Sequence, residues 1–265
     1  MATSSRLESE TDLERPNAAQ FAHELTDDEF LGGRVKLWQP KDGFRAGLDS
    51  VTLASAVQAK QGTRVCDLGI GAGTASLCLA ARVGDVRITG IEVDHDLAEL
   101  ARANGVRNRC KSFEVIEADI FARPRHVPRQ GFDHVITNPP FFDIARGTRA
   151  PQAAKARATS AHAKDLDAWL RFGRALVKGG GWLTAILPPE QLPVALNALA
   201  PRGLGTEIIP LWPKAGEPAK RAIIRVRINA RAPLRLLPGI VLHGTDGKPT
   251  RQAEAVLRHG EPLFK

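Results

Sequence analysis

The chain has 265 residues, of which 43% are hydrophobic and 25% are charged. This length can bury a sizeable core in one globular domain, and the absence of any run of 18 or more apolar residues argues against a membrane protein. The formal net charge of +8 attracts polyanions such as nucleic acid, although an arginine-rich, alanine-rich composition gives the same charge without such a partner.

Residues 1–25 are expected to form a disordered N-terminal tail. Their sequence mixes acidic, hydroxylated and small residues, and it has neither the basic patch nor the apolar stretch of a secretory signal. The cysteines, Cys66, Cys78 and Cys110, lie far apart and supply no CxxC metal pair and no obvious disulfide framework. Buried thiols are typical of a reducing compartment, so we expect a cytoplasmic protein without a metal centre.

Residues 26–265 are expected to form a single domain in three parts, namely 26–60, 61–190 and 191–265. In the first part, "RVKLWQPKDGF" alternates like a strand before a turn at Asp42-Gly43, and "LDSVTLASAVQA" has helical apolar spacing. The second part repeats one pattern, in which a short apolar run is followed by a turn and an amphipathic run.

This repeat predicts strands over residues 63–68, 86–93, 112–118, 132–138 and 181–187. Helices are expected near 74–83, 96–106 and 165–180, the last ended by glycines. Two further strand-like runs, 204–213 and 221–230, are joined by "KAGEPAK", which is too short for a crossover helix. The predicted fold class is therefore α/β: a mostly parallel seven-stranded sheet with an antiparallel C-terminal hairpin and helices on both faces.

A glycine-rich turn follows the first core strand. "VCDLGIGAGTAS" places Asp67, Gly69, Gly71 and Gly73 where open α/β sheets bind ligands. The next strand ends in "GIEVD", so Glu92 can accept hydrogen bonds from both ribose hydroxyls; we favour it over Asp94 because it ends the strand. The spacing G-x-G-x-G differs from the dinucleotide fingerprint and favours a ribose-bearing ligand without a pyrophosphate.

D-L-G-x-G-x-G followed by G-I-E resembles the S-adenosylmethionine site of the Rossmann-like methyltransferases. The resemblance implies that this chain binds S-adenosylmethionine and releases S-adenosylhomocysteine. It assigns the glycine loop to the methionine part, Glu92 to the ribose and Asp119 of "IEADIF" to the adenine amino group. A surface turn is the alternative role for Asp119.

The fourth core strand ends in Asn138, Pro139, Pro140 and Phe141. The prolines alone would merely stop a strand. An amine on an aromatic or acyl carbon is a poor nucleophile, however, and the Asn138 side-chain oxygen and the Pro139 carbonyl can each accept one of its hydrogens and localise its lone pair. Phe141 could stack on the planar target. These four residues are the predicted catalytic set.

N-P-P-[FY] resembles the signature of exocyclic-amine methyltransferases. The chain from about residue 30 onward resembles the bacterial tRNA1(Val) (adenine-37-N6)-methyltransferase-like family, through "FRAGLDSVTLASA", "NPPFF", "PKAGEPAKRAIIRV" and "IVLHGTDGKPTRQAEAVLR". The resemblance implies that the segment ending at Asp49 closes over the cofactor, with Asn138 at the same site. It implies methyl transfer to the N6 amine of adenine in RNA, and in tRNA above all.

Basic residues follow this motif and recur at the tip of the expected hairpin. They form the predicted RNA-binding set: Arg146, Arg149, Lys155 and Arg157 after the motif, and Lys214, Lys220 and Arg221 at the tip. A solvated loop without function is the alternative for those after Phe142. Other activities stay open: a protein-glutamine N5 methyltransferase shares the N-P-P-[FY] signature, an rRNA amine is a further substrate, and a non-catalytic RNA-binding module would retain the fold. The sequence does not decide between a monomer and a homodimer.

Overall fold

The computed structural model describes residues 24–42, 45–122, 124–140, 165–200 and 205–264. Within these ranges the core strands, in chain order, are β3 (Arg64–Leu68), β4 (Arg87–Glu92), β5 (Phe113–Glu117), β6 (Phe132–Thr137), β7 (Val177–Leu187), β8 (Thr206–Lys214) and β9 (Arg221–Arg227). The helices are α1 (Leu48–Ser55), α2 (Thr74–Val83), α3 (His95–Arg107), α5 (Leu192–Leu199) and α6 (Arg251–Leu257), and residues 165–176 are also helical.

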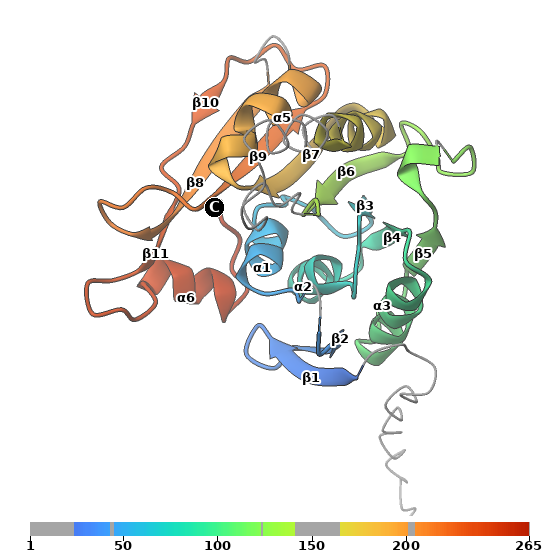
Figure 1. The fold of residues 1–265 in the computed structure, drawn as a ribbon, viewed down its shortest axis with the longest axis horizontal. Coiled ribbons are helices and arrows are strands. Elements are labelled where there is room, and N and C mark those ends of the chain that lie inside the picture. The colour runs from blue at the N-terminus through green and yellow to red at the C-terminus, as the bar shows by residue number, and fades with distance from the viewer. Residues whose placement is uncertain (1–23, 43–44, 123, 141–164, 201–204, 265) are drawn as a thin grey trace, which may run out of the picture.

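The core strands form one sheet in the order β8-β9-β7-β6-β3-β4-β5. Strands β3 to β7 pair in parallel, and β9 pairs antiparallel with both β7 and β8. The predicted α/β class, with a mostly parallel sheet and an antiparallel hairpin, is thereby confirmed (Figure 1).

Among the described residues the sheet has nine strands, two more than the expected seven. The additional strands, β10 (Arg235–Leu236) and β11 (Ile240–His243), both pair in parallel with β8. They cover the edge that β8 would otherwise leave unpaired. They are only two and four residues long, so their alternation of apolar and polar residues is too short to predict a strand.

The helix that starts at residue 165 ends at residue 176, earlier than the predicted end at residue 180. Gly179, Gly180 and Gly181 instead lie inside β7, where the pairing with β6 shifts register. Gly180 has φ +78°, and a Cβ on Gly181 would lie 2.6 Å from the Asp133 carbonyl oxygen. The glycines therefore permit an irregular strand and do not cap a helix.

Helices cover both faces of the sheet, as predicted. One face packs against α1, α2 and α6, which contribute Leu53, Leu77 and Val256 to one hydrophobic core. The opposite core contains Leu170 from the helical residues 165–176 and Ala198 from α5. None of the described helices has the length and apolar character needed to cross a membrane.

A separate antiparallel hairpin of β1 (Leu25–Phe30) and β2 (Val35–Pro40) lies beside α2 and α3 (Figure 1). Leu25 is buried and pairs with Pro40, and the Lys41 N–H donates a hydrogen bond to the Glu24 carbonyl oxygen, so the folded region includes residues 24 and 25 of the predicted tail. Strand β2 confirms the predicted strand in "RVKLWQP", whereas β1 was not expected, since "LTDDEF" carries three acidic residues.

Candidate active site

The ends of β3 and β6 lie side by side. The strands pair in parallel with Asp67 opposite Ile136, and Thr137 Oγ1 donates a hydrogen bond to the Leu68 carbonyl oxygen at 2.8 Å. Asp67 and Asn138 therefore reach the same edge of the sheet, as we expected from the carboxyl ends of parallel strands.

A cavity of about 420 Å³ opens at this edge. It brings together six residues that the sequence predicted: Asp67, Gly69, Gly71, Glu92, Asn138 and Pro140. Its other lining residues are Gln39, Ala46, Ser50, Ile70, Ala72, Thr74, Ala75, Val93, Leu97 and Trp169. This volume suits a small-molecule ligand.

The glycine turn has a backbone that only glycine adopts readily. Gly69 and Gly71 have φ of +74° and +54°. A Cβ on Gly69 would lie 2.8 Å from the Trp169 ring, whereas a Cβ on Gly71 would meet no protein atom within 4 Å. Gly69 thus admits the indole, and Gly71 leaves free space at the cavity wall.

Glu92 holds the glycine turn from the end of β4. Its Oε2 accepts a hydrogen bond from the Gly71 backbone N–H at 2.9 Å, and its Oε1 accepts from the N–H groups of Val93 and Asp94 at 2.9 and 3.2 Å. The Asp94 side chain instead caps α3 by accepting from the Leu97 N–H at 3.0 Å. The two acids therefore have separate positions, and only Glu92 lines the cavity.

Asp67 is buried, and Ser76 Oγ donates a hydrogen bond to its Oδ2 at 2.7 Å. Burial, the largest cause, and the charge of Glu92 raise the pKa of the Asp67 carboxyl to about 7, although the hydrogen bonds from Ser76 lower it. Near neutral pH, Asp67 therefore exchanges a proton, and a cationic ligand in the cavity would favour its ionised form.

This titration predicts a pH-dependent affinity for S-adenosylmethionine, the ligand that the sequence resemblance implies, which carries net positive charge. Because protonated Asp67 must lose its proton to meet a cation, the affinity should fall by up to about tenfold per pH unit below a pH of about 7 and level off above it. Calorimetry between pH 5.5 and 7.5 measures this slope. Asp67→Asn should bind more weakly and lose the slope; an equal slope in that variant would contradict the assignment.

Two buried polar atoms at the cavity have no hydrogen-bond partner among the described residues: Thr74 Oγ1 and Asn138 Oδ1. Burying an unsatisfied polar atom costs about 1–3 kcal/mol, so such atoms in a cavity wall point to a missing partner. With the carboxylates of Asp67 and Glu92 and the open space at Gly71, Thr74 Oγ1 fits a ligand that carries hydroxyl and amino donors, such as a nucleoside linked to an amino acid. The Asn138 Oδ1 can accept a hydrogen bond from an amine.

The predicted cofactor residues Gly73 and Asp119 and the predicted catalytic residue Pro139 lie outside the cavity wall. Gly73, at φ +93°, precedes α2 and packs near Phe113 and Leu77. Asp119 Oδ1 accepts a hydrogen bond from the Phe121 N–H at 2.8 Å, which is the contact of a turn residue. Pro139 is buried but does not line the cavity.

Asp49 and Arg221, predicted for the cofactor and for RNA respectively, form an ion pair with each other. The Arg221 Nε lies 2.8 Å from Asp49 Oδ2 and joins the first turn of α1 to the start of β9. Lys214 and Lys220 are exposed at the tip of the β8–β9 hairpin. The remaining predicted contacts, Phe141, Arg146, Arg149, Lys155 and Arg157, lie outside the described residues.

Sequence reasoning missed Gln39, Thr74 and Trp169 as cavity residues. Thr74 directly follows the glycine motif, and that position was the available signal. Trp169 carries no such signal in the sequence; its Nε1 donates a hydrogen bond to Thr137 Oγ1 at 3.0 Å, which fixes the indole at the cavity wall. Among the described residues, no cluster of three His, Cys, Asp or Glu side chains could hold a metal ion.

Residues 45–163 match the family model of the methyltransferase small domain. The chain is 33% identical over 154 residues to a tRNA1(Val) (adenine(37)-N6)-methyltransferase of Shewanella halifaxensis, a match that covers 57% of this chain and 60% of that relative. A relative of the same name from Bacteroides thetaiotaomicron is 26% identical, over 73% of this chain and 81% of its own length. The chain thus spans about three fifths of the first of these curated relatives.

Two solved structures share the fold. A predicted O-methyltransferase from Agrobacterium tumefaciens is 28% identical, with a TM-score of 0.64 over 78% of this chain and 94% of its own. A 16S rRNA N2 G1207 methyltransferase from T. Thermophilus, in complex with AdoMet and guanosine, is 17% identical, with a TM-score of 0.54 over 78% of this chain and 50% of its own.

Proposed function

We propose that this chain, whose residues 45–163 match the family model of the methyltransferase small domain, transfers a methyl group from S-adenosylmethionine to the N6 amine of adenine in RNA. The observation that carries the proposal is the position of Asn138. Its Oδ1 is buried and lacks a partner among the described residues, and Asn138 lines the cavity that Asp67 and Glu92 also line. An amide oxygen at this place suits an incoming amine donor.

The cavity residues divide between the cofactor and the methyl acceptor. When bound, S-adenosylmethionine supplies an electrophilic methyl group on a positively charged sulfur. Glu92 would accept the ribose hydroxyls, Gly69 and Gly71 would let the backbone approach the methionine part, and Asp119 would take the adenine amino group. Asp67 would supply negative charge, and Asp49, from α1, would close the N-terminal side of the site.

Asn138 and Pro139 would prepare the amine by geometry. Each accepts one amine hydrogen, which removes lone-pair density from the aromatic ring and directs it at the methyl group. The proline backbone holds both acceptors in place before the reaction, and Phe141 would stack on the base. A strong general base is not required, because methylation makes the amine more acidic and its proton can leave to water.

Transfer RNA is the substrate that we infer, and its adenine N6 amine the methyl acceptor. Both curated relatives described above are named for adenine 37 of tRNA1(Val), which supports this substrate. The net charge of +8 and the exposed Lys214 and Lys220 at the hairpin tip add electrostatic support. Arg146, Arg149, Lys155, Arg157 and Arg221 complete the proposed RNA-binding set, and a tRNA substrate places the protein in the cytoplasm.

Incubation with methyl-labelled S-adenosylmethionine and separated pools of tRNA, rRNA and protein tests this proposal. We expect label in tRNA, released on nuclease digestion as N6-methyladenosine. Label in rRNA alone would show that rRNA and not tRNA is the substrate. Label in protein alone would favour a glutamine N5 methyltransferase. Label on a ribose oxygen would contradict amine transfer, and S-adenosylmethionine binding without any transfer would favour a non-catalytic module.

A further inference from the structure

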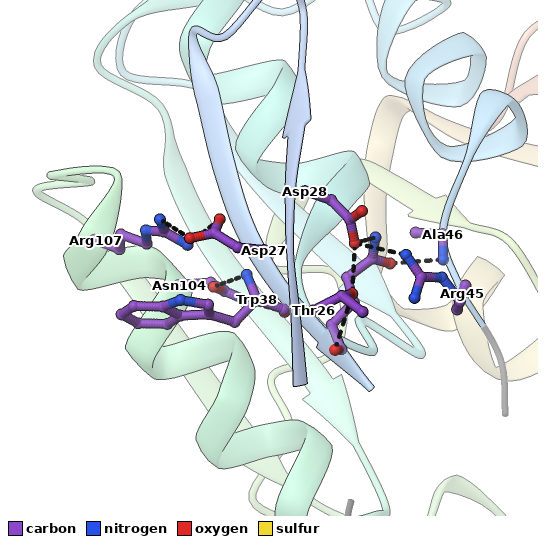
Figure 2. A network of polar contacts seen from close by, with 9 residues as sticks. Thr26, Asp27, Asp28, Trp38, Arg45, Ala46, Asn104 and Arg107 are labelled. Atoms are coloured by element: carbon purple, nitrogen blue, oxygen red, sulfur yellow. Dashed lines mark hydrogen bonds and ion pairs between the residues drawn. The ribbon is translucent and has the colours of Figure 1, made fainter. Parts of the chain in front are cut away.

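The β1–β2 hairpin carries polar side chains on both of its faces. In the antiparallel register Asp27 lies opposite Trp38, and Thr26 lies opposite Gln39. Because neighbouring strand residues alternate between faces, Asp27 and Trp38 share one face while Asp28 and Gln39 reach the other. Figure 2 shows the two faces with separate polar networks.

The face with Trp38 is fixed to α3 and to the glycine turn. Asn104 is fully buried; its Oδ1 accepts a hydrogen bond from the Trp38 N–H at 2.9 Å, and its Nδ2 donates to the carbonyl oxygens of Trp38 and Ala72, both at 2.9 Å. Arg107 lies 4.2 Å from the centre of the Trp38 ring and forms a two-bond ion pair with Asp27 (Figure 2). This face therefore anchors β2 beside the cavity.

The opposite face holds the chain segment that leads into α1. Asp28 Oδ2 accepts hydrogen bonds from Thr26 Oγ1 at 2.8 Å, Gln39 Nε2 at 3.0 Å and Arg45 Nη2 at 2.7 Å. Gln39 Oε1 then accepts from the Ala46 N–H at 2.8 Å. Asp28 and Gln39 thus bind the side chain of residue 45 and the backbone of residue 46, as Figure 2 shows for Asp28, Arg45 and Ala46.

Only a side chain with one donor and one acceptor can satisfy both partners of Gln39. Asp28 offers a carboxylate, which accepts, while Ala46 offers a backbone N–H, which donates. The orientation of the Gln39 amide is therefore determined by its two partners. Gln39 is 2% exposed, and its amide would be costly to bury without both of them.

We propose that Gln39 and Asp28 are positioning residues of the cofactor site, and that they hold residues 45 and 46 so that the entry to α1 completes the cavity wall. Gln39, Ala46 and Ser50 all line the cavity that contains Asp67, Glu92 and Asn138. The hairpin would thereby connect the glycine turn, through Asn104, to the opposite side of the cavity. This inference rests on the proposed function, because it assigns the cavity to S-adenosylmethionine.

Three variants test the inference by binding of S-adenosylhomocysteine. Gln39→Met keeps the side-chain length and removes both hydrogen bonds, so the Kd should rise about tenfold. Gln39→Glu places a carboxylate against Asp28 and should weaken binding similarly. Adding Asp28→Asn to Gln39→Glu restores a donor opposite an acceptor and should recover part of the affinity, which a merely destabilised fold would not do.

Asp27→Asn is the matched control, because Asp27 adjoins Asp28 but contacts Arg107 on the other face. It should lower the melting temperature without changing the Kd by more than about twofold. In turnover assays, Gln39→Met should raise KM for S-adenosylmethionine and leave kcat at saturation nearly unchanged. Hydrogen exchange supplies a readout without ligand: the Ala46 amide should exchange faster in Gln39→Met and at the wild-type rate in Asp27→Asn.

The outcomes separate the two proposals. Unchanged Kd and unchanged Ala46 exchange in Gln39→Met would overturn the positioning role alone. Equal losses of affinity in Gln39→Met and Asp27→Asn would also overturn it, because hairpin stability would then be the cause. A wild-type chain that binds neither S-adenosylmethionine nor S-adenosylhomocysteine would overturn the proposed function, and with it the assignment of this wall to a cofactor.

Discussion

Asn138→Ala is expected to lower kcat for RNA methylation by roughly 10²–10³-fold, the loss typical of one prepositioned hydrogen-bonding group at a reacting centre. The Asn138 Oδ1 is buried without a partner among the described residues, and Asn138 lines the cavity, so the proposal assigns this oxygen to the incoming amine. Because the Asn138 oxygen would bind the amine that receives the methyl group and not the cofactor, the Kd for S-adenosylhomocysteine should change by only a few fold. Single-turnover kinetics and calorimetry measure the two quantities.

Asn197→Ala provides a control for the same substitution at an exposed position on α5. It should keep both kcat and Kd at the wild-type values. Turnover at the wild-type rate in Asn138→Ala would contradict the role of Asn138 on which the proposed function rests. A loss of S-adenosylhomocysteine binding as large as the loss of turnover would instead place Asn138 in cofactor binding.

Glu92→Gln is expected to weaken S-adenosylmethionine binding by about 10–100-fold, since hydrogen bonds to a charged group contribute about 1.5–3 kcal/mol. Both carboxylate oxygens of Glu92 accept from backbone N–H groups, Oε2 from Gly71 and Oε1 from Val93. A glutamine side chain must place its NH₂ group against one of these donors. The substitution therefore disturbs the glycine turn and removes an acceptor for the ribose. Calorimetry at pH 7.5 measures the affinity.

Asp94→Asn is the control for Glu92→Gln, because it changes an acid two residues away that caps α3 and does not line the cavity. Asparagine caps helices about as well as aspartate, so affinity and melting temperature should both stay close to wild type. An affinity loss in Asp94→Asn that equals the loss in Glu92→Gln would show that the choice between these acids was wrong.

The sequence by itself determined the layered α/β fold and the edge at which the cavity opens. Apolar periodicity is local, and parallel strands must end at a common edge, so Asp67, Glu92 and Asn138 could be predicted to lie near one another before any coordinates. The turn at Gly69 and Gly71 could also be predicted from the sequence, because glycine adopts a positive φ without steric cost.

Only the tertiary structure decided which other side chains complete the site. Gln39 and Trp169 reach the cavity from a hairpin and a helix that flank the core strands, and Asp49 meets Arg221 across 172 positions of the chain. Similarly, the sequence predicted that the glycines at 179–181 end a helix, whereas the structure has them in β7, which pairs with β6. Local periodicity carries no information on such contacts, because they depend on how elements distant in sequence pack, and packing is set by the whole fold.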